Sequence, residues 1–393
     1  MRQSVTFPRI LCLIVILAAV GQMTNTIYAP AMKLMADYFG ELPTRVQTVM
    51  ALYLLPYGFS QFIYGPLSDR FGRRPIVLVG LIIYLMGSLL AIFAVTFSHL
   101  QWGSFLQGMG IGVGGVMVRT VMRDLYSGHE LHRANSYTSV ALIVAPIIAP
   151  LIGGLLADVL GWRVDFIFLG LFGSAVLMIH YRQLPETNHF IGIREERWIS
   201  NYLSVLRNRQ FLGFMTCLLV SFAGVSVFEA SAGLLFTEVL HYTPAYASLL
   251  YIVPLPAYLM GSYLSGVLGK FFSITKVILI GIVLLGICSI MMLWSGFFMS
   301  MTAWTILIPI NFYFLGVGIL FPAGTTGALE PFPTLAGTAG SIMGGVQNIG
   351  AGLATLISAT MRQTSQLPLA FILTGLTLFA VITYHFFLSE RKV

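Results

Sequence analysis

The stretch Gly65-Pro66-Leu67-Ser68-Asp69-Arg70-Phe71-Gly72-Arg73-Arg74 joins two long apolar segments of the chain. Residues 46–68 and 75–118 on either side contain no Asp, Glu, Lys or Arg. A helix needs about 20 apolar residues to cross roughly 30 Å of hydrocarbon, so both flanks predict transmembrane helices. The glycines permit a tight turn between closely packed helix ends, and the arginines hold that turn at an anionic membrane surface.

The composition extends this prediction to the whole chain. Of its 393 residues, 57% are hydrophobic and only 9% are charged, against about 25% charged in a soluble domain. The mean hydropathy is +0.88. Because the chain has too few charges to cover the surface of a soluble globule, the composition excludes a cytosolic enzyme, a nucleic-acid-binding domain and a disordered tail.

Charge-free stretches give the number of spans. Two of them, 75–118 and 277–329, are long enough for two helices each, with breaks expected near Ser98-His99 and Ser295-Gly296. The other stretches are 10–32, 46–68, 134–157, 166–181, 210–228, 239–269, 331–361 and 363–389. The stretch 10–32 is longer than the apolar region of a signal peptide, so we expect it to be a transmembrane helix that the mature protein retains. The sequence therefore predicts an all-α membrane protein with twelve transmembrane helices.

The basic residues predict the orientation. With the N-terminus in the cytoplasm, seventeen of the 21 Lys and Arg residues lie on the inner side and four on the outer side. The four outer residues are Lys33, Arg45, Arg163 and Arg362. This asymmetry follows the positive-inside rule and places both termini in the cytoplasm. Topology thus accounts for the net charge of +7, and no nucleic-acid partner is expected.

The longest polar connector divides the chain into two parts. It covers residues 185–209 and follows the sixth predicted helix. We therefore expect an N-terminal six-helix half at 1–184, a cytoplasmic connector at 185–209 and a C-terminal six-helix half at 210–393.

Two pairs of short motifs indicate that these halves are repeats. Gly65-Pro-Leu-Ser-Asp69 and Gly266-Val-Leu-Gly-Lys270 are 201 residues apart, and Gly112-Val-Gly114 and Gly316-Val-Gly318 are 204 apart. Repeated six-helix halves are a transporter architecture, in which the substrate site lies near the membrane midplane between them.

Glu229 is an acidic residue well inside a predicted span. A carboxylate in the membrane is costly unless it is paired, protonated or facing water, so it is a candidate functional residue. We expect Glu229 to couple transport to protons, with Asp124 as the second candidate. The alternative is a protonated glutamate that only bonds a neighbouring helix. The repeat offset assigns residues 25–28 of the first helix as the counterparts of Glu229.

Polar and aromatic side chains recur within the predicted helices. Tyr53, Tyr57, Gln61 and Tyr64 have helical spacing and share one face. Aromatic rings offer apolar area and cation–π attraction, so we expect a central cavity for amphipathic cations. The residues expected to line it are Gln22, Asn25, Thr26, Tyr28, Tyr53, Tyr57, Gln61, Tyr251, Tyr258, Trp304 and Asn311. The alternative for Tyr64 and Trp304 is a belt at the membrane interface.

The loop at 65–74 resembles the G-x-L-x-D-R-x-G-R-R signature of the major facilitator superfamily, with every fixed position present. The motif residues are Gly65, Leu67, Asp69, Arg70, Gly72, Arg73 and Arg74. The resemblance implies the major facilitator fold, and it implies that Asp69 takes part in cytoplasmic charge contacts that stabilise the outward-facing state. The alternative for the arginines is that they only fix the topology.

A second stretch, Ala145-Pro146-Ile-Ile-Ala149-Pro150-Leu-Ile-Gly153-Gly154, resembles the G-x-x-x-G-P-x-x-G-G motif of the family's drug–proton antiporters. Alanine replaces the first two glycines. Pro150 frees a backbone carbonyl and bends the helix. Small residues such as Ala149, Gly153 and Gly154 allow close contact with another helix.

A third motif of the family is incomplete. It places an arginine three residues before Gln-Gly in the fourth helix, where this chain has Ser104 before Gln107-Gly108. Arg119 lies nearer the inner end of the same helix, and nothing in the sequence assigns it the missing role.

Segments along the whole chain resemble multidrug exporters of the EmrD type, close to the Bcr/CflA branch. They are Thr26-Ile-Tyr-Ala-Pro-Ala, Arg119-Thr-Val-Met-Arg-Asp124-Leu-Tyr, Phe228-Glu-Ala, Leu329-Glu-Pro-Phe-Pro and Leu335-Ala-Gly-Thr-Ala-Gly340. The resemblance implies a monomer in a bacterial inner membrane that exports amphipathic drugs, dyes or detergents in exchange for protons. Bcr/CflA-like proteins often carry an aspartate where this chain has Thr26.

Two other functions compete with this one. The first is a uniporter or symporter for a small metabolite. The second is a membrane-embedded enzyme, which would need a cluster of His, Asp, Glu or Cys at membrane depth. The seven histidines lie at span ends or in loops, and the three cysteines fall in three different helices. We therefore expect no catalytic residues, no metal and no cofactor, with the proton as coupling ion.

Overall fold

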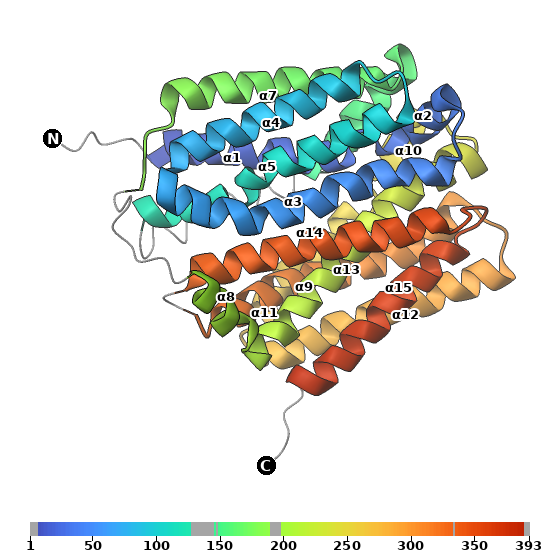
Figure 1. The fold of residues 1–393 in the computed structure, drawn as a ribbon. Coiled ribbons are helices and arrows are strands. Elements are labelled where there is room, and N and C mark those ends of the chain that lie inside the picture. Colours follow the sequence, from blue (N-terminus) through green and yellow to red (C-terminus); the bar gives the residue numbers. More distant parts are fainter. Residues whose placement is uncertain (1–6, 127–144, 147, 189–197, 333–334, 389–393) are drawn as a thin grey trace.

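Apolar segments of the predicted lengths form helices that run side by side (Figure 1). The computed structural model describes residues 7–126, 145–146, 148–188, 198–332 and 335–388. The first half contains α1 (Phe7–Thr26), η1 (Ala29–Ala31), α2 (Met32–Phe39), α3 (Pro43–Phe71), α4 (Arg73–Ile92), α5 (Phe97–Leu125), the helix Ile148–Leu160 and α7 (Arg163–Gln183). The short helix α8 (Trp198–Leu206) follows. The second half contains α9 (Arg209–Leu234), η2 (Leu235–Val239), α10 (Pro244–Leu250), α11 (Leu255–Leu268), α12 (Ile274–Phe298), α13 (Ala303–Leu329), α14 (Ala336–Thr360), α15 (Leu367–Thr383) and η3 (Tyr384–Leu388).

The predicted all-α fold class with twelve spans is confirmed. Within the described residues, ten helical segments are long and apolar enough to cross a membrane. Two further helices complete the set. One is α3, which has 29 residues but carries several polar and tyrosine side chains. The other is Ile148–Leu160, a shorter apolar helix. Part of the predicted span 134–157 and part of the connector 185–209 lie outside the described residues.

Helix boundaries differ from the predicted breaks by a few residues, because local caps set them. The break expected at Ser98-His99 falls earlier, since α5 begins at Phe97 and the Thr96 hydroxyl accepts a hydrogen bond from the His99 N–H at 3.3 Å. The break expected at 295–296 falls later, where Thr302 caps the start of α13. Small polar residues inside the apolar stretches were therefore poor markers of helix ends.

The first predicted helix is interrupted and longer than the stretch 10–32. α1 ends at Thr26, a 3₁₀ turn contains Pro30, and α2 continues to Phe39. Pro30 has no N–H to donate, which favours an interruption at this point. Gly40 ends α2 with a φ of 63°, a left-handed conformation that glycine adopts without strain.

The helices form two groups that meet along α3 and α14 (Figure 1). α1 begins and η3 ends at the same end of the bundle, which also carries α8 and the turn between α3 and α4. We call this the Gly72 end, after the glycine in that turn, and the opposite end, where α2 finishes, the Gly40 end.

A glycine sets how closely the two groups approach. A Cβ atom at Gly58 of α3 would lie 2.6 Å from the Gly345 carbonyl oxygen and 2.8 Å from the Ile349 nitrogen, both in α14. These neighbours are backbone atoms that no side-chain rotation can move. Gly58 therefore allows backbone-to-backbone contact between the halves, as small residues do in membrane helix pairs.

We expect Gly58→Ala to lower the thermal unfolding temperature of the detergent-solubilised protein, because the added methyl group forces α3 and α14 apart at a cost of about 1–3 kcal/mol. The matched control is Gly286→Ala in α12, where the added Cβ would meet no atom of another described segment within 4 Å. Equal melting temperatures for the two variants would contradict the tight contact at Gly58.

Candidate functional site

Glu229 lies between the two halves. It is 9% exposed on α9, and its Oε2 accepts a hydrogen bond from Asn25 Nδ2 of α1 at 3.5 Å. Asn25 is 4% exposed, and its Oδ1 has no hydrogen-bond partner among the described residues. The two residues are 204 positions apart, which is the offset between the repeats. The structure thus brings Glu229 to the first of its four predicted counterparts.

A second pair with the same relationship lies toward the Gly40 end. Lys33 of α2 forms an ion pair with Glu238 of η2, and these residues are 205 positions apart. Residues related by a two-fold repeat contact each other directly only near the symmetry axis. The pseudo-two-fold axis therefore passes between α1–α2 and α9–η2, and Glu229 lies beside it.

Two neutral side chains fix the backbone around Glu229. Tyr251 donates its hydroxyl to the Glu229 carbonyl at 2.7 Å. Gln47 of α3 is fully buried and donates from Nε2 to the Ala230 carbonyl at 3.2 Å. The sequence prediction included Tyr251 but not Gln47, although a glutamine inside an apolar span was an available signal. Both contacts hold Glu229 without supplying a positive charge.

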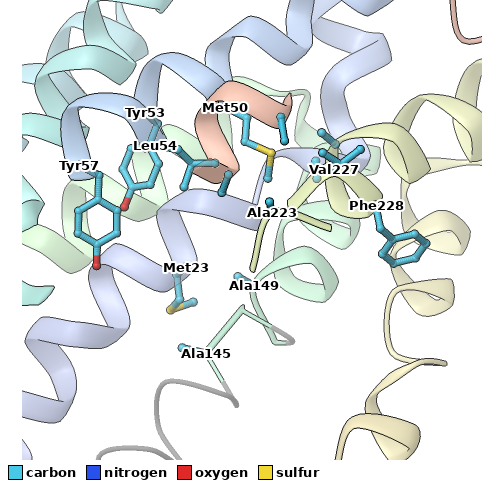
Figure 2. Close-up of a cluster of buried hydrophobic side chains, with 14 of the residues drawn as sticks. Met23, Met50, Tyr53, Leu54, Tyr57, Ala145, Ala149, Ala223, Val227 and Phe228 are labelled. Atoms are coloured by element: carbon cyan, nitrogen blue, oxygen red, sulfur yellow. The ribbon is translucent and has the colours of Figure 1, made fainter. Parts of the chain in front are cut away.

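Aromatic and methionine side chains from both halves gather in one cluster (Figure 2). Its member Met23 is two residues from Asn25 on α1, and its member Phe228 directly precedes Glu229 on α9. The rings of Tyr53 and Tyr57 lie 5.6 Å apart, and the Tyr53 hydroxyl donates to the Gly21 carbonyl at 2.6 Å. Such groups offer apolar, adaptable contact area. We call these residues the aromatic–methionine cluster: Met23, Met50, Tyr53, Leu54, Tyr57, Ala145, Ala149, Ala223, Val227 and Phe228.

Trp304 does not belong with this cluster. Its side chain is 60% exposed in the first turn of α13, so it occupies the outer surface near a helix end, where a membrane-interface belt would lie. The prediction that Trp304 lines a central cavity is wrong. The sequence could not separate the two placements, because a tryptophan is equally compatible with both.

The other predicted cavity residues have varied surroundings. Tyr28 stacks on Phe166 of α7 with ring centroids 5.5 Å apart, inside the first half. Asn311 donates to the Leu307 carbonyl of its own helix at 2.6 Å. Gln22 and Tyr258 are half-buried, whereas Gln61 is 1% exposed.

Thr26 satisfies the carbonyl that the antiporter-like motif leaves free. Pro150 has no N–H, so the Pro146 carbonyl one turn earlier lacks its helical donor. The Thr26 hydroxyl of α1 donates to this oxygen at 3.1 Å. The two glycines of this motif contact different halves. A Cβ at Gly153 would collide with the Ile27 carbonyl of the first half, and a Cβ at Gly154 would lie 2.6 Å from the Pro244 carbonyl of the second half.

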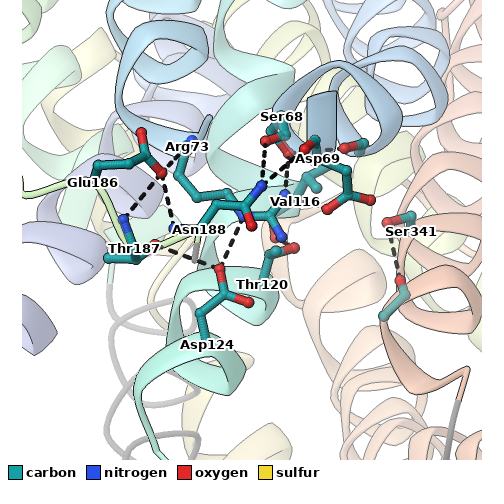
Figure 3. Close-up of polar contacts among 12 residues, drawn as sticks. Ser68, Asp69, Arg73, Val116, Thr120, Asp124, Glu186, Thr187, Asn188 and Ser341 are labelled. Carbon is teal, nitrogen blue, oxygen red and sulfur yellow. Dashed lines mark hydrogen bonds and ion pairs between the residues drawn. The ribbon is translucent and has the colours of Figure 1, made fainter. Parts of the chain in front are cut away.

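The loop motif builds a charge cluster at the Gly72 end (Figure 3). The Arg73 side chain is 5% exposed and pairs with Asp69 at 2.5 Å and with Asp124 at 2.9 Å. It also donates to the Ser68 hydroxyl at 2.7 Å. Asp124 therefore lies in this cluster at the end of α5, in contact with Arg73, and not beside Glu229. Arg70 is exposed and lies over the ring of Phe71.

Glu186 completes the cluster and was not predicted. Its carboxylate accepts hydrogen bonds from the backbone N–H of Arg73 at 2.9 Å and of Arg74 at 3.1 Å. These N–H groups open α4, where a negative charge also stabilises the helix dipole. Gly72 has a φ of 96°, and a Cβ there would lie 2.5 Å from Glu186 Oε2. Gly72 thus allows both the turn and the close approach of the carboxylate. A Cβ at Gly65 would instead lie at an ordinary contact distance, 3.7 Å from the Tyr202 hydroxyl.

The halves also contact each other at the Gly72 end. Arg119 of α5 donates to the Gly340 carbonyl of α14 at 2.8 Å. From the connector, Tyr202 of α8 donates to the Phe62 carbonyl of α3 at 3.5 Å. Burial and the nearby Asp69 carboxylate raise the pKa of Tyr202 to about 12, so this hydroxyl remains a donor at neutral pH. Contacts between the halves therefore occur on both sides of Glu229.

Known proteins resemble this chain in sequence and in fold. A model of the Major Facilitator Superfamily matches residues 14–355. Multidrug resistance protein D of Escherichia coli (strain K12) is 40% identical over 375 residues, covering 95% of this chain and 94% of that protein. The bicyclomycin resistance protein homolog of Haemophilus influenzae is 25% identical over 381 residues, covering 93% and 92%. The partially occluded inward-open xylose transporter XylE from Escherichia coli shares the fold with a TM-score of 0.77 at 14% identity, covering 99% of each chain.

We expect Asp124→Asn to destabilise the protein by about 1–3 kcal/mol, because it removes a charged partner from a buried guanidinium. The matched control is Glu41→Gln, whose partner Arg45 has a side chain 58% exposed, so that its loss costs at most about 1 kcal/mol. Thermal unfolding in the same detergent measures both. A melting temperature no lower for Asp124→Asn than for the control would contradict a structural role for this ion pair.

Proposed function

The chain belongs to the Major Facilitator Superfamily, and we propose that it exports amphipathic drugs, including lipophilic cations, in exchange for protons by alternating access. The observation that carries this proposal is the position of Glu229, which is buried between the halves and directly follows Phe228 of the aromatic–methionine cluster. A carboxylate attracts a cation, and the cluster offers apolar contact without demanding one shape. The names of the relatives, which include two drug-resistance proteins, support the same function.

Exchange of drug for proton follows because a lipophilic cation and a proton compete for the Glu229 carboxylate. A lipophilic cation favours the ionised carboxylate and expels the proton, and a proton neutralises the carboxylate after the cation has left. Asn25 suits both states, because its amide donates from Nδ2 to a carboxylate and accepts at Oδ1 from a carboxylic acid after rotation. Neither state then leaves a buried charge without a partner.

Alternating access requires that the halves break their contacts at one end while keeping those at the other. The six-helix units 1–184 and 210–393, joined by the connector 185–209, are the bodies that rock. Lys33–Glu238 is the contact that opens at the Gly40 end, and Arg119–Gly340 is the one that opens at the Gly72 end. The Asp69–Arg73–Asp124 cluster lies within the first half and moves with it.

The proposed location is the bacterial inner membrane, with a monomer spanning the lipid bilayer and the Gly72 end in the cytoplasm. We expect a C-terminal green fluorescent protein fusion to fluoresce and a C-terminal alkaline phosphatase fusion to be inactive, since both termini face inward under the positive-inside rule. A reporter inserted after Gly40 is expected to give the opposite pattern. Phosphatase activity at the C-terminus would overturn this orientation.

We expect Glu229→Gln to abolish drug-evoked proton flux in inverted membrane vesicles, because glutamine cannot exchange a proton. Proton movement is followed with a pH-sensitive dye while lipophilic cations are added. The matched control is Glu330→Gln, a change at an exposed acid after α13, which should leave the flux intact. Normal coupled flux in Glu229→Gln would reject Glu229 as the coupling residue. Substrate movement without proton counterflow in the wild type would favour a uniporter, and proton movement in the same direction a symporter.

A further inference from the structure

A second charged side chain, Arg119, lies between the halves, and the exchange proposed above uses only its contact with the Gly340 carbonyl. Arg119 is six residues from the end of α5, which places it about 9 Å along the helix from that end. Its only hydrogen bond in the described part of the chain goes from NH1 to the Gly340 carbonyl at 2.8 Å. Glycines of α14 make room for it, since a Cβ at Gly340 would lie 2.8 Å from Arg119 Cδ.

Arg119 has no carboxylate partner among the described residues, which sets it apart from Arg73. A guanidinium carries five N–H donors, and the Gly340 carbonyl uses one of them. An unpaired cation at this depth is costly and marks a candidate functional position. Four donors thus remain for a group that the described protein does not supply.

The neighbours of Arg119 lead from it to the aromatic–methionine cluster. Arg119 lies near Tyr57, a member of the cluster. A Cβ at Gly344 would lie 3.0 Å from Arg119 NH1 and would also collide with the Gln61 side chain. Gln61 is 1% exposed, and its Oε1 has no hydrogen-bond partner in the described residues. The half-buried Arg119 and the buried Gln61, both with unused hydrogen-bonding capacity, therefore adjoin the cluster.

Arg119 and Glu229 flank the cluster from different directions. The Tyr53 hydroxyl bonds the Gly21 carbonyl, which fixes the register of α3 against α1. From that contact Asn25, and with it Glu229, lies one turn toward the Gly40 end. Gln61 lies two turns from Tyr53 toward the Gly72 end, beside Arg119. The cluster is thus bordered by an acid on one side and a base on the other.

We propose that Arg119 and Gln61 form an anion subsite, which takes the carboxylate, sulfonate or sulfate group of an amphipathic substrate whose apolar part lies on the cluster. The planar guanidinium suits two-oxygen anions, because it can donate two parallel hydrogen bonds. The atom of Gln61 without a partner is Oε1, so Gln61 supplies a further donor, Nε2, once its amide turns over. This proposal deepens, and rests on, the proposed export function, and it extends the substrate class from cations to anionic and zwitterionic amphiphiles.

The test uses two fluorescent probes with the same eleven-carbon chain and dansyl group, one ending in a carboxylate and the other in trimethylammonium. Binding is measured by fluorescence titration of the full chain in phosphatidylcholine nanodiscs. We expect Arg119→Gln to weaken carboxylate binding about tenfold, the effect of losing one charge-assisted interaction, and to change ammonium binding less than twofold. Arg119→Lys, which keeps the charge but loses the two parallel hydrogen bonds, should restore part of the carboxylate affinity.

Two further variants separate recognition from folding. Gln61→Leu should also weaken the carboxylate probe selectively. Arg123→Gln, four residues further along α5 and exposed, should leave both probes unchanged. An equal loss for both probes in Arg119→Gln and Gln61→Leu would show that these residues only hold the halves together, and it would overturn the proposal. Unchanged carboxylate binding would overturn it too.

A different experimental result would contradict the proposed export function. If the ammonium probe evokes no proton flux in wild-type vesicles, proton-coupled cation export is wrong, whatever Arg119 does to carboxylate binding. If the ammonium probe drives normal flux and the carboxylate probe binds without dependence on Arg119, only the anion subsite is wrong.

Discussion

The close approach of the two halves at glycines is the contact on which the rest of the interior depends. In a bilayer no hydrophobic force draws helices together, so packing must do so. Gly58 brings α3 against α14, and Gly233 of α9 lies against the Ala29 carbonyl, where a Cβ would collide. Because the backbones are this close, the short Asn25 side chain reaches Glu229 and Arg119 reaches the Gly340 carbonyl. Larger residues at these glycines would separate both pairs.

The buried charges fall into two groups according to where their partners lie. Arg73 finds Asp69 and Asp124 within the first half, so a rigid rotation of that half leaves the cluster intact. Glu229 and Arg119 instead bond neutral groups of the opposite half, and any rocking motion changes their surroundings. If the surroundings of a charge differ between two conformations, a ligand that binds this charge favours one of the two. This difference distinguishes structural charges from those suited to coupling, although sequence alone presents all of them as ionisable residues near or within spans.

The sequence predicted the features that the bilayer dictates. Apolar length determined the number of helices, and the repeat offset predicted that residue 25 would be a counterpart of Glu229. What it missed depended on contacts between distant segments. Gln47 bonds a carbonyl 183 residues away and Glu186 bonds backbone N–H groups more than 110 residues away, so the local sequence identifies neither bonding partner. Trp304 was misplaced, and the ion pair of Asp124 with Arg73 was not predicted, because a residue near a span end has the same sequence context whether it faces a charge cluster, lipid or the interior.

The charge of the substrate decides which part of the proton gradient drives its export. If Glu229 exchanges one proton for one monovalent cation, no net charge crosses the membrane, and a pH difference of one unit supports a tenfold drug gradient, about 1.4 kcal/mol. A zwitterion with no net charge leaves one charge moving inward per proton, and 100 mV then adds about 2.3 kcal/mol. An amphiphile held at both Glu229 and Arg119 would therefore be exported against a steeper gradient than a simple cation. The base on the far side of the aromatic–methionine cluster thus bears on the energetics of export as well as on recognition.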